Sequence, residues 1–265
     1  MGMVGLGSMG LPIAARARAA GYPLTFSARR PAVIASATAL GATDAGSLRG
    51  VGAASNVVIV CVFNDDQVAQ VCLGDDGLIA AMAPGSTLVN HTTGSPATAG
   101  VLAATAAPRG VRVLDATISG GADDIERGEL TLLVGGDPAV LEEVRPVLAT
   151  YASPIVHVGA VGDGQRVKLV NNALFAANVS LVAEAERVAV ALGVEPAAAL
   201  GAIRHCSGDS YALRTTVALG SSARLQELAG KYMRKDIATI LAVAAEQAVD
   251  VGQLGAVATW TGRPG

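Results

Sequence analysis

Val4-Gly5-Leu6-Gly7-Ser8-Met9-Gly10 decides the fold, because three of its glycines form a G-x-G-x-x-G turn beside a short apolar run. Leu11-Pro12-Ile13-Ala14 follows at once and predicts the first turn of a helix. In such a turn Gly5 permits the tight bend, Gly7 admits phosphate oxygens to the backbone, and Gly10 lets helix and strand pack closely. Backbone N–H groups at the helix N-terminus then bind an anion. The stretch predicts a pyrophosphate site, against the plain alternative of a glycine-rich loop before an Ala-rich helix.

The second expected strand carries the residues that select the dinucleotide. An NAD site places Asp or Glu at the end of this strand, where the acid binds the ribose 2′-hydroxyl. This chain has Arg29 and Arg30 there and no acid. Because a guanidinium offers a planar fork to phosphate oxygens, the pair predicts NADP rather than NAD. Two solvated loop charges are the alternative.

Composition limits the class of protein. The chain has 265 residues, 51% hydrophobic and 15% charged, with a net charge of −3, enough for two modest domains and no reason to expect nucleic acid or an anionic membrane as a partner. The most apolar segment, Leu169 to Ala183, contains three asparagines and falls short of the ~18–20 uninterrupted apolar residues that a membrane span needs. The N-terminal stretch is not expected to be a signal peptide. Three unclustered cysteines indicate reduced thiols of a cytoplasmic protein and no metal site.

The first part of the chain alternates short β-branched runs with helical stretches. This alternation predicts a doubly wound α/β domain of the Rossmann type over residues 1–161. Residues 57–62 are apolar throughout, as in a parallel strand covered on both faces, and Asn64 is expected to cap the helix that follows. The expected strands are Met1–Val4, Leu24–Ser27, Val57–Val62, Thr87–Asn90, Val111–Ala116, Leu130–Gly135 and Pro154–Val158.

Residues 162–265 show no further strand pattern. A long helix is expected from Gln165 to Leu192, ended by Gly193 and apolar on nearly every face, which is typical of a large core or a subunit interface. Further helices are expected from Glu195-Pro196, over Ala212–Leu219, and from Asp236 towards Val251, with residues 259–265 as a tail. The chain therefore predicts an all-α C-terminal domain joined to the first by a long interdomain helix.

Lys168 is the first candidate for chemistry. Asn172 follows at i+4, so both lie on one face of the long helix. A partly desolvated ammonium has a lowered pKa, which suits proton transfer near neutrality. The alternative is a lysine whose stem covers apolar surface while its amine reaches water.

Two loops beyond strand ends are further candidates. Ser119, Gly120 and Gly121 form a possible nest of amides for a carboxylate, or an ordinary strand-to-loop connection. Residues 90–96, which include Thr93, either frame a nicotinamide or cap the next helix through Ser95.

A third candidate is the run Lys231-Tyr232-Met233-Arg234-Lys235-Asp236, expected as a basic turn before the last helix. Lys235 is expected to reach the active site and Asp236 to begin that helix, whereas an exposed charged turn is the ordinary interpretation. The three histidines are scattered and give no hydrolase triad.

Together these stretches resemble the motifs of the β-hydroxyacid dehydrogenases, which include 3-hydroxyisobutyrate dehydrogenase, tartronate semialdehyde reductase and, more distantly, 6-phosphogluconate dehydrogenase. The resemblance rests on four stretches in the family's order and spacing: residues 5–14, 115–121, 162–172 and 235–236. It implies an NADP-dependent oxidoreductase that transfers hydride between a nicotinamide and a small β-hydroxy acid or its semialdehyde. It also implies a homodimer or homotetramer.

By the same resemblance, Lys168 is the general acid/base and Asn172 orients the substrate. Ser119, Gly120 and Gly121 bind the substrate carboxylate. Lys235 completes the site, and the cofactor contacts are Gly5, Leu6, Gly7, Ser8, Met9, Gly10, Arg29, Arg30, Thr93 and Lys235.

The chain departs from the family pattern at Thr117, where proline is usual, so a looser or differently aimed loop is expected. The family also usually continues through a further helix after Val251. Two other functions stay open: an imine reductase of the same fold, whose members typically lack the lysine, and a non-catalytic dinucleotide-binding protein.

Overall fold

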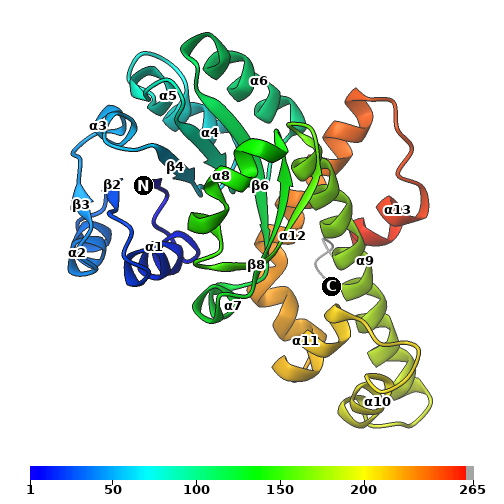
Figure 1. Ribbon diagram of the computed structural model, residues 1–265. Helices are drawn as coiled ribbons and strands as arrows, with labels where there is room; N and C mark the ends of the chain where they lie inside the picture. The colour runs from blue at the N-terminus through cyan, green and yellow to red at the C-terminus, as the bar shows by residue number, and fades with distance from the viewer. Residues whose placement is uncertain (261–265) are drawn as a thin grey trace. The chain divides into compact units, whose positions relative to one another are not determined.

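An eight-stranded sheet in the order β3-β2-β1-β4-β5-β6-β7-β8 organises the first part of the chain in this computed structural model (Figure 1). All neighbouring strands pair in parallel except β6 and β7, which are antiparallel. The strands are β1 (Gly2–Val4), β2 (Thr25–Ser27), β3 (Thr43–Asp44), β4 (Val57–Val60), β5 (Thr87–Asn90), β6 (Arg112–Ser119), β7 (Leu130–Gly135) and β8 (Ala152–Gly159). The predicted α/β domain is confirmed, with β3 and the antiparallel pair as additions.

Helices cover both faces of this sheet because side chains alternate along each strand. On β4, Ile59 joins one buried hydrophobic cluster, whereas Val58 and Val60 join the other. The first cluster packs α1, α2, α7 and α8 on the sheet, and the second packs α3, α4, α5 and α6. The helices are α1 (Gly10–Ala19), α2 (Pro31–Ala39), α3 (Leu48–Ala53), α4 (Asp65–Cys72), α5 (Leu78–Ala81), α6 (Pro96–Ala106), α7 (Ala122–Arg127) and α8 (Pro138–Leu148).

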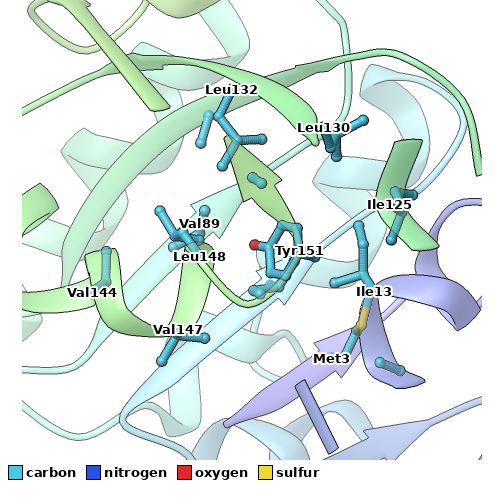
Figure 2. Packing of buried hydrophobic residues seen from close by; sticks show 14 of the residues in the cluster. Met3, Ile13, Val89, Ile125, Leu130, Leu132, Val144, Val147, Leu148 and Tyr151 are labelled. Atoms are coloured by element: carbon cyan, nitrogen blue, oxygen red, sulfur yellow. The ribbon is translucent and has the colours of Figure 1, made fainter. Parts of the chain in front are cut away.

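Tyr151 occupies the middle of the first cluster (Figure 2). It is fully buried together with Met3, Ile13 and Leu132, which come from β1, α1 and β7. Burial of apolar area contributes ~25 cal/mol per Å², so a cluster of this kind supplies much of the stability of the sheet.

The structure describes residues 1–260, which divide into two units that separate between Lys168 and Leu169. That point lies inside the long helix α9 (Asp163–Ala191), which begins at the sheet unit and continues into the helical one. The other helices of the second unit are α10 (Pro196–Ile203), α11 (Tyr211–Leu219), α12 (Ser222–Glu246) and α13 (Gly252–Trp260). The predicted all-α second part is confirmed for the described residues.

Two predictions in the second unit are wrong. The run 231–236 is not a turn, because it lies inside α12, which is capped at Ser221. The prediction took the charged residues as a sign of a turn. The run has no Gly or Pro that would end a helix, and Met233 and Ile237 continue the buried face of α12. Residues 259 and 260 belong to α13 and not to a tail, whereas 261–265 lie outside the described residues. No helix within residues 1–260 is both long and apolar enough for a bilayer crossing.

Candidate active site

The glycine turn lies where the strand order reverses, between β1 and β4, which is where open α/β sheets bind ligands. Gly5 has a φ of +95°, and a Cβ on it would lie 2.1 Å from the carbonyl oxygen of Cys61. A Cβ on Gly10 would lie 2.0 Å from the carbonyl oxygen of Gly5, but a Cβ on Gly7 would meet nothing within 4 Å. Packing therefore requires the first and third glycines, and the second opens the backbone to a ligand. This is the arrangement that a pyrophosphate needs.

Arg29 and Arg30 follow β2 at the same end of the sheet, since β1 and β2 are parallel. Both are exposed, and Arg30 stands at the N-cap position of α2. Within residues 1–260 neither guanidinium hydrogen-bonds to the protein, so both can approach a ligand phosphate.

The loop after β5 is held by side chains on several sides. The amide of Val62 donates to the hydroxyl of Thr92 (3.0 Å), and the amide of Ser95 donates to Asp65 (2.9 Å). The Ser95 hydroxyl accepts from the amide of Ala97 and caps α6, as the sequence predicts for one of its alternatives. The backbone around Thr93 is thus tied to the segment that follows β4, the strand next to the one that carries the glycine turn.

Asp115 on β6 fixes the beginning of α9. Its carboxylate accepts hydrogen bonds from the amides of Gly162 (2.7 Å) and Gln165 (2.9 Å). Burial raises the pKa of Asp115, although both amides act to lower it. The buried carboxylate therefore satisfies two helix N-terminal donors that would otherwise be unpaired.

Thr117 contributes to the same junction. Its hydroxyl donates to the carbonyl oxygen of Gly164 (3.1 Å), and its strand pairs with β7 from Asp115 to Ser119 without a break. Thr117 itself therefore lies in a paired strand, and the expectation of a looser or differently aimed loop, compared with the family, stays a prediction. The hydroxyl supplies a tie to α9 that a proline ring would lack.

Lys168 lies one turn beyond these anchors and is only 8% exposed. Gly164, at i−4, packs so tightly on β6 that a Cβ would lie 2.4 Å from the carbonyl oxygen of Asp115. Because residues four apart share a helix face, Lys168 projects from the face of α9 that packs on β6. Contacts within the sheet unit therefore fix the backbone position from which the Lys168 side chain projects.

The Ser119–Gly121 segment is shaped by an acid that the sequence analysis did not assign. The Gly121 amide donates to Asp124 (2.7 Å) in the first turn of α7, and this carboxylate also pairs with Arg127 at the end of α7. A Cβ on Gly120 would lie 2.6 Å from that carboxylate. One amide of the expected nest is thus engaged within the chain. An acid three residues after the N-cap glycine was the available signal.

In the second unit, Asp236 joins two of the expected site residues. The Asn172 amide donates to Asp236 (2.6 Å), and the Lys235 amine pairs with the same carboxylate at 2.9 Å. Asp236 is buried in α12. The sequence analysis expected it only as a helix-start acid, and no local pattern pairs it with a residue of α9.

His91 forms a buried pair with Tyr151 behind the β5 loop. Its Nδ1 lies 2.5 Å from the carbonyl oxygen of Ala116, and its Nε2 lies 2.8 Å from the Tyr151 hydroxyl. The Ala116 carbonyl accepts a hydrogen bond from Nδ1–H, so Nε2 accepts a hydrogen bond from the Tyr151 hydroxyl. Burial lowers the pKa of His91 to about 4 and raises that of Tyr151. No group of three or more His, Cys, Asp or Glu suited to a metal ion occurs in residues 1–260.

Comparison with known proteins agrees with this geometry. Residues 1–159 match the NAD binding domain of 6-phosphogluconate dehydrogenase, and residues 162–261 match the family described as NAD-binding of NADP-dependent 3-hydroxyisobutyrate dehydrogenase. A 2-(hydroxymethyl)glutarate dehydrogenase of Eubacterium barkeri is 35% identical over 80% of this chain and 71% of its own length. An NAD-dependent L-serine dehydrogenase of Pseudomonas aeruginosa is 34% identical over 92% and 84%. The structure of a 3-hydroxyisobutyrate dehydrogenase of Mycobacterium tuberculosis with L-serine has a TM-score of 0.86, 27% identity, and coverage of 98% and 91%.

Proposed function

Because the chain belongs to the β-hydroxyacid dehydrogenase family, whose members are NAD(P)-dependent oxidoreductases, we propose that Lys168 is the acid/base that interconverts a small β-hydroxy acid and its semialdehyde or keto form. The observation that carries the proposal is the junction of α9 with β6. Asp115 and Thr117 fix the turn that precedes a buried lysine, on the same sheet that carries the glycine turn.

The residues fit a dinucleotide, since the glycine turn leaves the Gly7 backbone open to phosphate oxygens. A nicotinamide held there would supply the hydride acceptor for the carbinol carbon of the substrate. Lys168, as the free amine, accepts the hydroxyl proton at Nζ, and as the ammonium it returns that proton in the reverse direction. Burial of Lys168 keeps bulk water from this exchange.

The other roles follow the family assignment. Ser119 and Gly120 bind the substrate carboxylate, with Gly121 only where Asp124 releases its amide. Asn172 orients the substrate through its amide, which Asp236 holds in one orientation. Lys235 contributes a positive charge to substrate and cofactor, and Thr93 contacts the nicotinamide portion.

Replacement of Lys168 by alanine tests this function. We expect kcat to fall about 10²–10⁴-fold, the usual contribution of a positioned acid/base, with little change in cofactor affinity. The matched control is Arg166→Ala, which removes an exposed cation from the same helix and breaks only an ion pair with Asp163. Near-normal turnover of Lys168→Ala would refute the role.

NADP is the proposed cofactor, on the strength of the two exposed arginines that follow β2. Each charge-assisted hydrogen bond contributes about 1.5–3 kcal/mol, so Arg29→Ala and Arg30→Ala should each raise the KM for NADPH about 10- to 100-fold. The KM for NADH should stay unchanged. A wild-type preference for NADH would overturn the assignment.

We propose a homodimer or homotetramer in the cytoplasm, supported by exposed apolar residues along α9, such as Val170, Leu174 and Leu181, and by three free cysteines. Sedimentation equilibrium tests the assembly, and a monomer at micromolar concentration would contradict it.

An assay panel separates the alternatives. 3-Hydroxyisobutyrate, glycerate, threonate and L-serine are supplied with NADP⁺, and a cyclic imine is supplied with NADPH. Turnover of a hydroxy acid supports the proposal, and turnover of the imine alone would identify an imine reductase. Tight NADPH binding without any turnover would favour a non-catalytic binding protein. Lys168 is the residue that favours the dehydrogenase.

A further inference from the structure

The side chain of Gln165 holds the loop after β5 from both sides of Thr93. Its Oε1 accepts the amide of Gly94 (2.8 Å), and its Nε2 donates to the carbonyl oxygen of Thr92 (2.8 Å). The side chain thus pairs with the loop as a neighbouring strand would. Gln165 is only 1% exposed, so water does not compete for either bond.

Asp65 packs closely against the same loop. A Cβ on Gly94 would lie 2.1 Å from Asp65, and the amide of Ser95 donates to the same carboxylate. Gly94 is therefore held between Asp65 and Gln165.

Gln165 also belongs to the anchored turn of α9, because its own amide donates to Asp115. Lys168 follows at i+3, on the next turn of the same helix. A single residue therefore joins the loop that carries Thr93 to the helix that carries Lys168.

We propose that Gln165 is a positioning residue that sets the distance between Thr93 and Lys168, and so between the nicotinamide and the acid/base. The structural part stands on the hydrogen bonds alone, whereas the kinetic part rests on the proposed function. The role needs one donor and one acceptor in a neutral side chain, which an amide supplies.

Gln165→Met tests the structural part without catalysis. Methionine has a similar length and offers no strong hydrogen bond, so the Gly94 amide loses its acceptor. In the protein without cofactor, we expect hydrogen exchange at Gly94 to become at least about tenfold faster, while the amides of β4 keep their protection. The control is Gln70→Met on α4, an exposed glutamine whose side chain makes no hydrogen bond within residues 1–260. Unchanged protection of Gly94 would overturn the inference.

Kinetics test the positioning part. For Gln165→Met we expect kcat to fall about 10- to 100-fold, as for a misplacement of about 1 Å, with substrate KM changed less than about threefold. Deuterium at the carbinol carbon should give a larger isotope effect on kcat than in the wild type, because hydride transfer becomes slower than product release. A lowered melting temperature with normal kcat in the folded protein would show a merely structural role and refute the proposal.

Gln165→Glu tests the hydrogen bonds with a side chain that can regain both of them when it is protonated. A protonated carboxyl offers the same donor and acceptor as the amide, but a carboxylate faces the Thr92 carbonyl with no donor. The charged groups around the position are Asp65, Asp115 and Lys168. We expect the ratio of variant to wild-type kcat to rise towards one as pH is lowered, while Gln70→Glu keeps a constant ratio. A ratio that is independent of pH would contradict the donor requirement.

The two proposals fail in different ways. If no substrate is turned over by the wild type, the proposed function fails, yet exchange at Gly94 still tests the contact. If the wild type is active and Lys168→Ala is not, but Gln165→Met keeps full kcat, only the positioning role fails.

Discussion

Acidification should destabilise the protein through His91. Burial lowers the pKa of this side chain from 6.5 to about 4, whereas an unfolded chain keeps the ordinary value. Between these two values the unfolded state binds a proton that the folded state does not, so stability is lost as pH falls through this window. Each unit corresponds to about 1.4 kcal/mol, which gives a loss of ~3 kcal/mol between pH 7 and pH 4. That is a large share of the 5–15 kcal/mol typical of a folded domain.

Urea unfolding at half-unit steps of pH measures this loss, with His91→Gln as the variant that cannot titrate. The sequence pI of about 5.6 lies inside this pH window, where a low net charge favours aggregation. Unfolding is therefore followed by circular dichroism at low micromolar concentration. The difference in unfolding free energy between wild type and variant should shrink by ~3 kcal/mol as pH falls from 7 to 4. His205→Gln, which alters an exposed histidine, should parallel the wild type.

Asp115 acts in the opposite sense and cancels from that comparison. Burial raises its pKa, so the folded state holds a proton that the unfolded state releases, and its contribution grows as pH falls. Because wild type and His91→Gln share this carboxyl, the difference reports His91 alone. Equal pH slopes for the two proteins would refute the buried, neutral state of His91.

Three further results are expected. Gly7→Ala should keep the melting temperature, since a Cβ there meets no protein atom, but should weaken NADPH binding at least about tenfold; Gly100→Ala in α6, equally open, should leave binding unchanged. Asp124→Ala should release the Gly121 amide and lower the KM for carboxylate substrates, at a cost of about 1 kcal/mol from the lost cap, measured by kinetics and urea unfolding. Thr117→Val should lower kcat through the lost tie to α9 while leaving NADPH affinity intact, and an unchanged kcat would contradict that.

Local patterns in the sequence account for most of the sheet unit. The glycine turn, the Asn64 and Ser95 caps and the strands at Thr87–Asn90 and Leu130–Gly135 are confirmed, because each depends on residues close together in the chain. The strand β3 has two residues and no apolar alternation, so its pattern gives no signal.

Contacts between distant residues account for what the sequence did not predict. Asp115 lies about fifty positions before the two amides that donate hydrogen bonds to it, and Asn172 lies far before its partner Asp236 along the chain. Such pairs arise from topology, which periodicity does not report. For the same reason the sequence does not reveal that β7 runs antiparallel to β6. The alternation of side chains along a strand shows which residues face the core but not the direction of the strand in the sheet.

The antiparallel pair explains how the sheet holds the lysine that we propose as the acid/base. Pairing with β7 continues β6 to Ser119, and the side chains of Asp115 and Thr117 on this strand hydrogen-bond to the start of α9. Those two side chains, with Gln165, fix the first turn of the helix before it leaves the sheet unit. The position of Lys168 is thus a consequence of the sheet, and variants that loosen this junction should lose turnover before they lose cofactor binding.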